Sequence, residues 1–132
     1  MPATATQFIN PPTLPASPGY SQVAVVSGGT LIVIAGQVAL DTKGTIVGPG
    51  DFALQTSQVF KNLMAALEAA GAGPEHLVKL TTFVTDVSQL ASFRQVRDQF
   101  LDTARPPAST LVQVTRLFRP EFLIEIEALA VR

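Results

Sequence analysis

The ten prolines constrain the fold of this chain most, because none of them falls inside a periodic run of apolar residues. Five lie within the first eighteen residues, and the others are Pro49, Pro74, Pro106, Pro107 and Pro120. Proline fixes φ and lacks a backbone donor, so it interrupts helices and central strands. The prolines therefore predict an extended N-terminal arm over residues 1–20, followed by unbroken segments that can form helices and strands.

The pattern of apolar residues predicts mainly strands at the two ends of this remainder. Two β-branched runs, at 22–26 and 30–35, are separated by Gly28-Gly29, which predicts a hairpin. A short strand is expected near 38–40. Alternating or apolar runs predict three further strands, at 78–85, 110–117 and 122–131.

Two helices are predicted between these strands. Asp51 is placed to cap the first, and Gly71 lies where a left-handed residue ends a helix. Ser88 is placed to cap the second, whose inward face is expected to contain Leu90, Phe93, Val96 and Phe100.

The resulting order, β-β-(β)-α-β-α-β-β, predicts one α+β domain over residues 1–132. Long connections through the helices indicate crossovers, and the first and last strand pairs are expected to be hairpins. The architecture is then a mixed six-stranded sheet with both helices on one face.

The other face of this sheet is expected to be covered by a second copy of the chain. Alternation places Glu125 and Glu127 on that face among apolar residues, and it places Leu111 and Gln113 there on the neighbouring strand. Charged residues make up only 14% of the chain, against about 25% in typical soluble domains. Sheet-to-sheet packing between subunits accounts for both observations.

Composition excludes several classes of function. The chain has no cysteine and a net charge of −1, which argues against thiolate chemistry and against nucleic-acid or anionic-membrane partners. His76 is the only histidine, so neither a metal site nor a Ser-His-Asp triad is predicted. No apolar run approaches the ~20 residues of a membrane span, and no secretory signal is evident. We expect a soluble cytoplasmic protein.

Glu125 and Glu127 are the most informative polar residues, because two carboxylates on a half-buried strand face cost free energy unless they are paired or hydrogen-bonded. One interpretation is an ion pair at a subunit interface, for example with Arg116 or Lys79. The other is a carboxylate with a raised pKa that activates water or relays a proton.

Several motifs are spread along the chain: Gly19-Tyr20, Ala35-Gly36-Gln37, Ala69-Ala70-Gly71, residues 81–86, residues 112–117 and residues 124–132. In this combination and order they resemble the Rid (YjgF) family over essentially the whole chain. The resemblance implies a chorismate-mutase-like fold and a homotrimer whose sheets form a central barrel, with a ligand cleft between each pair of neighbours. It also implies hydrolysis of enamines and imines of 2-amino acids to 2-oxo acids and ammonia, without a cofactor.

The resemblance carries site roles to particular positions. Glu125 matches the acidic residue that positions water or the imine nitrogen, Tyr20 the cleft tyrosine, and Gly36 the glycine beside the substrate. Leu111 occupies a position that is often cysteine and whose backbone groups hold the ligand.

Two positions depart from the pattern of deaminating members. Ser109 stands where an arginine binds the substrate carboxylate, and Arg94 stands where a cleft asparagine is frequent. Three hypotheses follow: Arg94 supplies the displaced positive charge, the cleft takes a neutral carbonyl, enamine or imine compound, or the trimer binds a metabolite without turnover. Arg94 could equally be a solvent-facing helix residue.

The sequence therefore predicts a cofactor-independent hydrolase of the enamine/imine deaminase type, with substrate choice altered at Ser109. The alternative is a non-catalytic, metabolite-binding or regulatory trimer of the same family.

Overall fold

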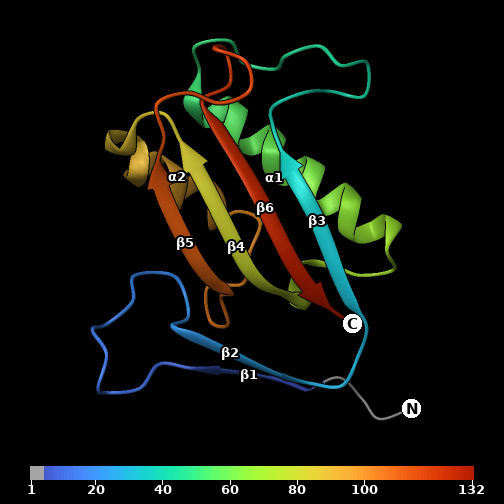
Figure 1. Cartoon of the computed structure of the whole chain (residues 1–132), viewed down its shortest axis with the longest axis vertical. Coiled ribbons are helices and arrows are strands. Elements are labelled where there is room, and N and C mark those ends of the chain that lie inside the picture. Colours follow the sequence, from blue (N-terminus) through green and yellow to red (C-terminus); the bar gives the residue numbers. More distant parts are fainter. Residues whose placement is uncertain (1–4) are drawn as a thin grey trace.

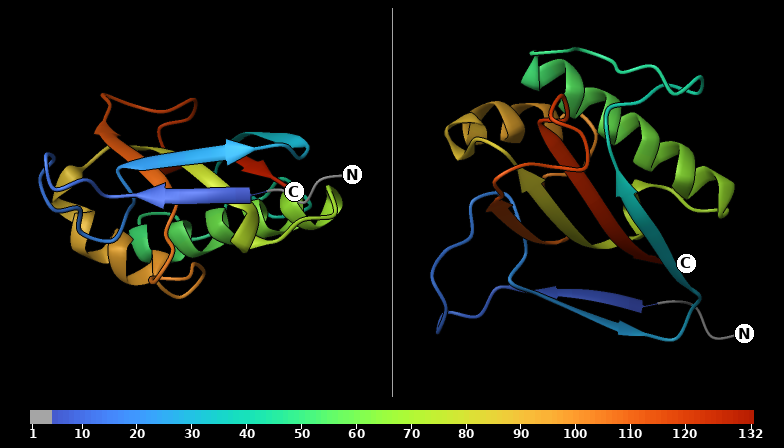
Figure 2. Two further views of the ribbon diagram at one scale, coloured as in Figure 1. Left: turned by 90° about the horizontal axis from the view of Figure 1, so that it is seen from below. Right: turned by 45° about the horizontal axis from the view of Figure 1, so that its top comes forward.

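The computed structural model describes residues 5–132, in which a main sheet carries two helices on one face and a two-stranded ribbon lies beside it (Figures 1 and 2). The long helix α1 lies behind one half of the sheet and the short helix α2 behind the other half (Figure 1). In chain order the elements are β1 (Ala5–Ile9), β2 (Val23–Ser27), β3 (Leu31–Gln37), α1 (Phe52–Ala69), the 3₁₀ turn η1 (Pro74–His76), β4 (Leu77–Val84), the 3₁₀ turn η2 (Val87–Gln89), α2 (Leu90–Arg97), β5 (Ala108–Gln113) and β6 (Ile124–Val131).

The strands form two sheets rather than one six-stranded sheet. The main sheet has the order β3-β6-β4-β5, in which β5 is parallel to β4 while β6 is antiparallel to both β3 and β4. β1 and β2 form a separate antiparallel ribbon, and a single bridge between Ser21 and Ala108 links the two sheets. The predicted mixed α+β architecture is confirmed, but the six-stranded sheet is wrong.

Residues 5–132 of the structure contain six strands, as predicted, but they are not the six that were predicted. Residues 5–9 of the expected extended arm form β1, whereas the rest of the predicted arm up to residue 20 contains no strand and residues 1–4 lie outside the described part. The segment near 38–40 contributes only an isolated bridge between Leu40 and Ile46.

The first predicted hairpin is wrong, because β2 pairs with β1 and β3 pairs with β6. Gly28 and Gly29 both have positive φ, so they turn the chain from one sheet into the other. Directly after this turn, Thr30 exchanges two backbone hydrogen bonds with Arg132, of 2.7 and 3.1 Å. The end of β6 thus provides the partner that β2 would otherwise have supplied.

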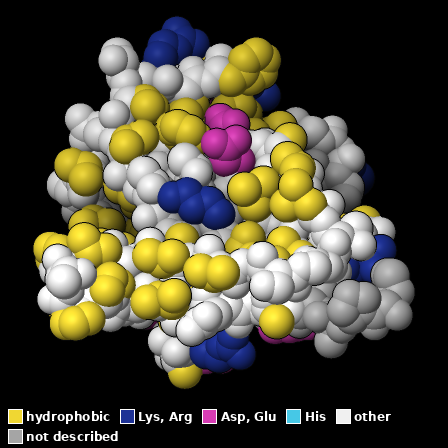
Figure 3. Space-filling model, turned by 60° about the horizontal axis from the view of Figure 1, so that its bottom comes forward, with side chains coloured by type: hydrophobic (Ala, Val, Ile, Leu, Met, Phe, Trp, Pro, Cys, Tyr) yellow, Lys and Arg dark blue, Asp and Glu magenta, His cyan; other side chains and the backbone are white. Residues whose placement is uncertain are grey.

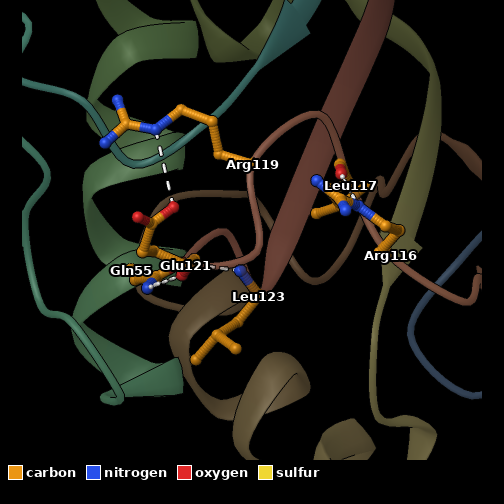
Figure 4. A network of polar contacts seen from close by, with 6 residues as sticks. All are labelled: Gln55, Arg116, Leu117, Arg119, Glu121 and Leu123. Carbon is orange, nitrogen blue, oxygen red and sulfur yellow. Dashed lines mark hydrogen bonds and ion pairs between the residues drawn. The ribbon is translucent and has the colours of Figure 1, made fainter.

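The last predicted hairpin is also wrong. β5 follows α2 by a crossover and pairs in parallel with β4, and β6 then enters the middle of the sheet. Gln55 of α1, which is fully buried, holds the intervening loop: its Nε2 donates to the Glu121 carbonyl (2.9 Å), and its Oε1 accepts from the Leu123 amide (2.9 Å) (Figure 4). Figure 4 also shows the exposed ion pair between Arg119 and Glu121 in this loop.

The first helix begins and ends as predicted, whereas the cap of the second does not. Asp51 accepts a hydrogen bond from the Leu54 amide (3.0 Å), and Gly71 has φ +69°. Ser88 does not cap α2. It lies in η2, which Asp86 caps by accepting from the Ser88 amide and hydroxyl, and α2 begins only at Leu90.

The hydrophobic core lies between the sheet and its helices. Strand β6 contributes Ile124, Ile126, Ala128 and Ala130, and the predicted inward residues Phe93 and Val96 of α2 are buried in the same core. Within residues 5–132 no helix combines the length and apolar sequence that crossing a membrane requires.

The opposite face of the main sheet is open and largely apolar. Val33 is 71% exposed and Leu31 is 63% exposed, although both lie within β3. Figure 3 shows hydrophobic side chains gathered over the β1–β2 ribbon and this face, interrupted by acidic and basic groups. Glu125 and Glu127 belong to this open face, where their β4 partners are Phe83 and Thr81.

The prediction that Leu111 and Gln113 share this open face is wrong. Leu111 is paired with the buried Thr82 and packs against the core beneath α2. The strand that contains it runs from 108 to 113 rather than from 110 to 117, and its parallel register with β4 sets which side chains point toward the helices.

Candidate functional site

A pocket of about 270 Å³ lies between α2, β5 and the segment that precedes β2. It brings together four of the predicted site residues: Tyr20, Arg94, Ser109 and Leu111. The remaining lining residues are Pro18, Val87, Leu90, Phe93 and Arg97. The pocket therefore combines an apolar floor with two guanidinium groups, a phenol and a hydroxyl.

Arg94 lines this pocket rather than facing only solvent. It lies on α2 three residues before Arg97, so the two side chains point to the same side of the helix. Within residues 5–132 Arg94 has no ion-pair partner.

Arg97 is a pocket residue that the sequence analysis missed. It is only 7% exposed, and its Nε donates to Oδ1 of Asp98 at 2.9 Å. Its Cζ lies 5.8 Å from the centre of the Phe93 ring. The only signal for Arg97 in the sequence is its helical spacing from Arg94. In the structure its guanidinium lies against Gly19, a contact that helix periodicity cannot reveal.

Glu125 and Gly36, the other two predicted residues, lie together on the open face of the sheet. The pairing of β3 with β6 shifts register between Ile34 and Gln37, and Gly36 lies in this irregularity. The carboxylate of Glu125 occupies the space where a side chain at position 36 would begin. Gly36 is therefore needed for the close approach of Glu125, not for its backbone angles.

Burial of Glu125 raises its pKa above the ordinary value of 4.5, and the neighbouring charge of Glu127 raises the pKa further. Lys79, a candidate partner for these glutamates, instead donates to Oγ1 of Thr110 at 2.6 Å. Among the described residues, neither Glu125 nor Glu127 forms an ion pair within the protomer. A carboxyl group whose pKa is raised by burial is suited to accept a proton and to return it.

The predicted site residues thus form two clusters on opposite faces of one protomer's sheet. Ser109 and Leu111 belong to the face covered by α2, and Glu125 belongs to the open face. One protomer cannot bring a ligand in the pocket against its own Glu125.

No group of three or more potential metal-ligating side chains occurs in the part of the chain from residue 5 onward. His76, the only histidine, accepts a hydrogen bond from the Gly73 amide at Nδ1 (3.0 Å) and stabilises the η1 turn.

The chain is similar to several known proteins. The family model described as endoribonuclease L-PSP matches residues 12–132. A RutC family protein of Synechocystis is 40% identical over 118 residues, covering 89% of each chain. A 2-iminobutanoate/2-iminopropanoate deaminase of Escherichia coli is 38% identical over 106 residues, which cover 79% of this chain and 81% of the deaminase.

Solved structures agree with this result. YyfB of Yersinia pestis, a protein of unknown function from the conserved Rid family, superimposes with a TM-score of 0.89 at 38% identity, covering 96% of this chain and 98% of that one. RidA from a Psychrobacter species gives a TM-score of 0.73 at 32% identity, with coverage of 96% and 99%.

Proposed function

Because the chain belongs to the endoribonuclease L-PSP family, which is the Rid (YjgF) family, we propose that it hydrolyses a small enamine or imine in a cleft between two protomers. The E. coli relative is a 2-iminobutanoate/2-iminopropanoate deaminase, which supports this class of reaction. Water is the only co-reactant that such a hydrolysis needs, so no cofactor is proposed.

The observation that carries the proposal is the separation of Glu125 from the pocket that contains Tyr20, Arg94 and Ser109. A neighbouring protomer that packs through the open face would place its Glu125 at the mouth of the pocket. The exposed apolar side chains of β3 favour such packing, because burying them removes apolar surface from water. The proposed assembly is a homotrimer whose open faces surround a central barrel.

Each protomer pair then supplies a complete set of groups for hydrolysis. The Glu125 carboxylate accepts a proton from water as the oxygen attacks the C=N carbon, and the resulting carboxyl returns a proton to the nitrogen. Glu125 then takes the hydroxyl proton of the tetrahedral adduct and passes it to the amino group, so that collapse of the adduct breaks the C–N bond and releases ammonia and the carbonyl product. Backbone groups at Gly36 and Leu111 hold the polarised C=N group, and Tyr20 closes one side of the pocket.

The charge of the pocket favours an anionic substrate. Ser109 supplies only a hydroxyl at the position of the family arginine, but Arg94 and Arg97 both line the same cavity. An arginine binds a carboxylate through two parallel charge-assisted hydrogen bonds, which a serine cannot provide. We therefore propose 2-imino acids as the substrates.

The test is ammonia release from freshly generated 2-iminopropanoate and 2-iminobutanoate. Glu125→Gln is expected to lower kcat by about 100-fold or more, the usual range for loss of a general acid–base group. Glu127→Gln is the matched control, because it removes the same charge from the same strand face and should mainly shift the pH profile.

Equal losses in the two variants would contradict the role of Glu125. If neither imine is turned over while 2-oxobutanoate still binds, the protein is a metabolite-binding trimer instead of a deaminase.

A further inference from the structure

The two arginines that line the pocket are held very differently. Arg97 is nearly buried, whereas Arg94 is partly exposed. Asp98 fixes the Nε side of the Arg97 guanidinium, and the Cζ atom of Arg97 lies over the Phe93 ring, 5.8 Å from the ring centre. Arg94 has no ion pair that fixes it among residues 5–132. Arg97 is therefore the preorganised cation of the pocket.

Gly19 leaves space for the Arg97 guanidinium. Gly19 has φ +80°, and a Cβ at this position would overlap the Nη2 atom of Arg97 and lie 3.1 Å from Nη1. A glycine next to Tyr20 thus lets the segment 18–20 lie directly against the end of the Arg97 side chain. The same segment lines the pocket.

The hydrogen-bonding capacity of Arg97 is only partly used. Nε is occupied by Asp98, but no residue in the described range accepts a hydrogen bond from Nη1 or Nη2. An arginine whose Nε edge is occupied still presents a pair of N–H groups from Nη1 and Nη2, and this pair matches the two oxygens of a carboxylate.

We propose that Arg97 binds the carboxylate of the substrate and so replaces the arginine that is absent at position 109. The anchor comes from α2 instead of β5, and its contacts with Asp98 and Phe93 hold it in place. Arg94 contributes long-range attraction at the mouth of the pocket. This assignment rests on the proposed function, because it identifies the acid group of the proposed 2-imino acid substrate as the group that Arg97 recognises.

The test compares two stable probes that differ only in charge, 2-oxobutanoate and its neutral amide, 2-oxobutanamide, in titrations followed by NMR or calorimetry. Arg97→Gln is expected to weaken binding of the acid by about 10- to 100-fold, the range for losing a hydrogen bond between charged groups. Binding of the amide should change less than about 3-fold, since it does not depend on that charge. Arg94→Gln should cost the acid less than Arg97→Gln does.

Two further variants separate recognition from folding. Arg119→Gln removes an equal charge from a loop outside the pocket and should leave both affinities unchanged. Adding Ser109→Arg to Arg97→Gln returns an arginine to the β5 side of the pocket and should restore at least about tenfold of the acid affinity, as expected for a regained charge-assisted pair.

Several results would overturn the assignment. They are no binding of the acid by the wild type, a parallel loss of acid and amide binding in Arg97→Gln, a larger loss in Arg94→Gln, or no restoration by Ser109→Arg in a folded double variant. Acid binding that depends on Arg97 without any imine turnover would refute the proposed deamination and leave the assignment intact. Imine turnover with an unchanged KM in Arg97→Gln would refute only the assignment.

Discussion

At the scale of single residues, Gly36 is the position where one methyl group should alter activity without unfolding the protein. A Cβ there would meet the end of the Glu125 side chain, which is only half-buried and can move away. Gly36→Ala is therefore expected to leave the melting temperature within about 2 °C, a shift of well under 1 kcal/mol, while lowering kcat by at least tenfold.

The control for this prediction is the double variant with Glu125→Gln. If the alanine acts by displacing Glu125, it should have almost no further effect on kcat once that carboxylate is gone, since coupled residues are not additive. Independent, multiplicative losses would show that Gly36 acts in some other way.

The raised pKa of Glu125 predicts how stability depends on pH. The folded protein holds the Glu125 proton more tightly than the unfolded chain, so ionisation of this group destabilises the fold as pH rises from 4.5 through the raised pKa. Glu125→Gln should thus melt at the same temperature as wild type near pH 4 and at a higher temperature at pH 7. Thermal unfolding at these two values measures the difference, and a wild type that is the more stable protein at pH 7 would contradict the sign.

The sequence singles out Glu125 as a candidate site residue but not Arg97, for a physical reason. Two glutamates in an apolar strand stand out because burying a carboxylate is costly, and that cost is visible in the pattern itself. An arginine on a short helix is unremarkable until its contacts with Asp98, Phe93 and Gly19 are known. Those contacts depend on how the segment before β2 packs against α2.

At the scale of secondary-structure elements, Gln55 connects α1 to the loop that leads into β6. Its side chain makes three hydrogen bonds to backbone groups, those of Gly48, Glu121 and Leu123, at 2.9–3.1 Å. Because the side chain is fully buried, Gln55→Ala would leave backbone groups without partners as well as a cavity. We expect a loss of about 2–4 kcal/mol in the free energy of unfolding, measured by urea denaturation.

Thr56→Ala is the comparison for this prediction, because Thr56 is equally buried but bonds only to the Phe52 carbonyl of its own helix. It should cost clearly less than Gln55→Ala. A similar loss in both would mean that the loop before β6 does not depend on Gln55.

The elements that the sequence predicted correctly are those determined by local chemistry. Asp51 and Gly71 delimit α1 through their own hydrogen bond and backbone angle, so α1 was predictable. Both hairpins failed because β6 pairs with β3 and β4 at once, and no signal near Gly28-Gly29 reports a partner about a hundred residues away in the chain. Strand pairing is the non-local part of this fold.

At the scale of the whole molecule, the fold separates the chemistry of the site between two faces of one sheet. Groups on opposite faces of the sheet can act on one ligand only if they come from different protomers. In the proposed trimer, each cleft therefore combines Glu125 of one protomer with the pocket of the next. The proposed trimer would also account for the low charge content and for the exposed β3 side chains. This arrangement can be tested by combining two inactive variants in one oligomer and measuring whether they complement each other.

Two inactive variants should regain activity when they are mixed. Glu125→Gln has an intact pocket, whereas Ser109→Glu has an intact Glu125 but places a carboxylate in the pocket, where it would repel an acid substrate and pair with Arg97. In a trimer that contains both variants, about one cleft in three is intact, because each cleft draws its two halves from different protomers. Coexpressed, differently tagged chains purified through both tags should therefore show deaminase activity of this order, and light scattering should give a mass near three times 13.9 kDa. If every site lay within a single protomer, no mixture could contain an intact site, so mixed oligomers without activity would refute the shared cleft.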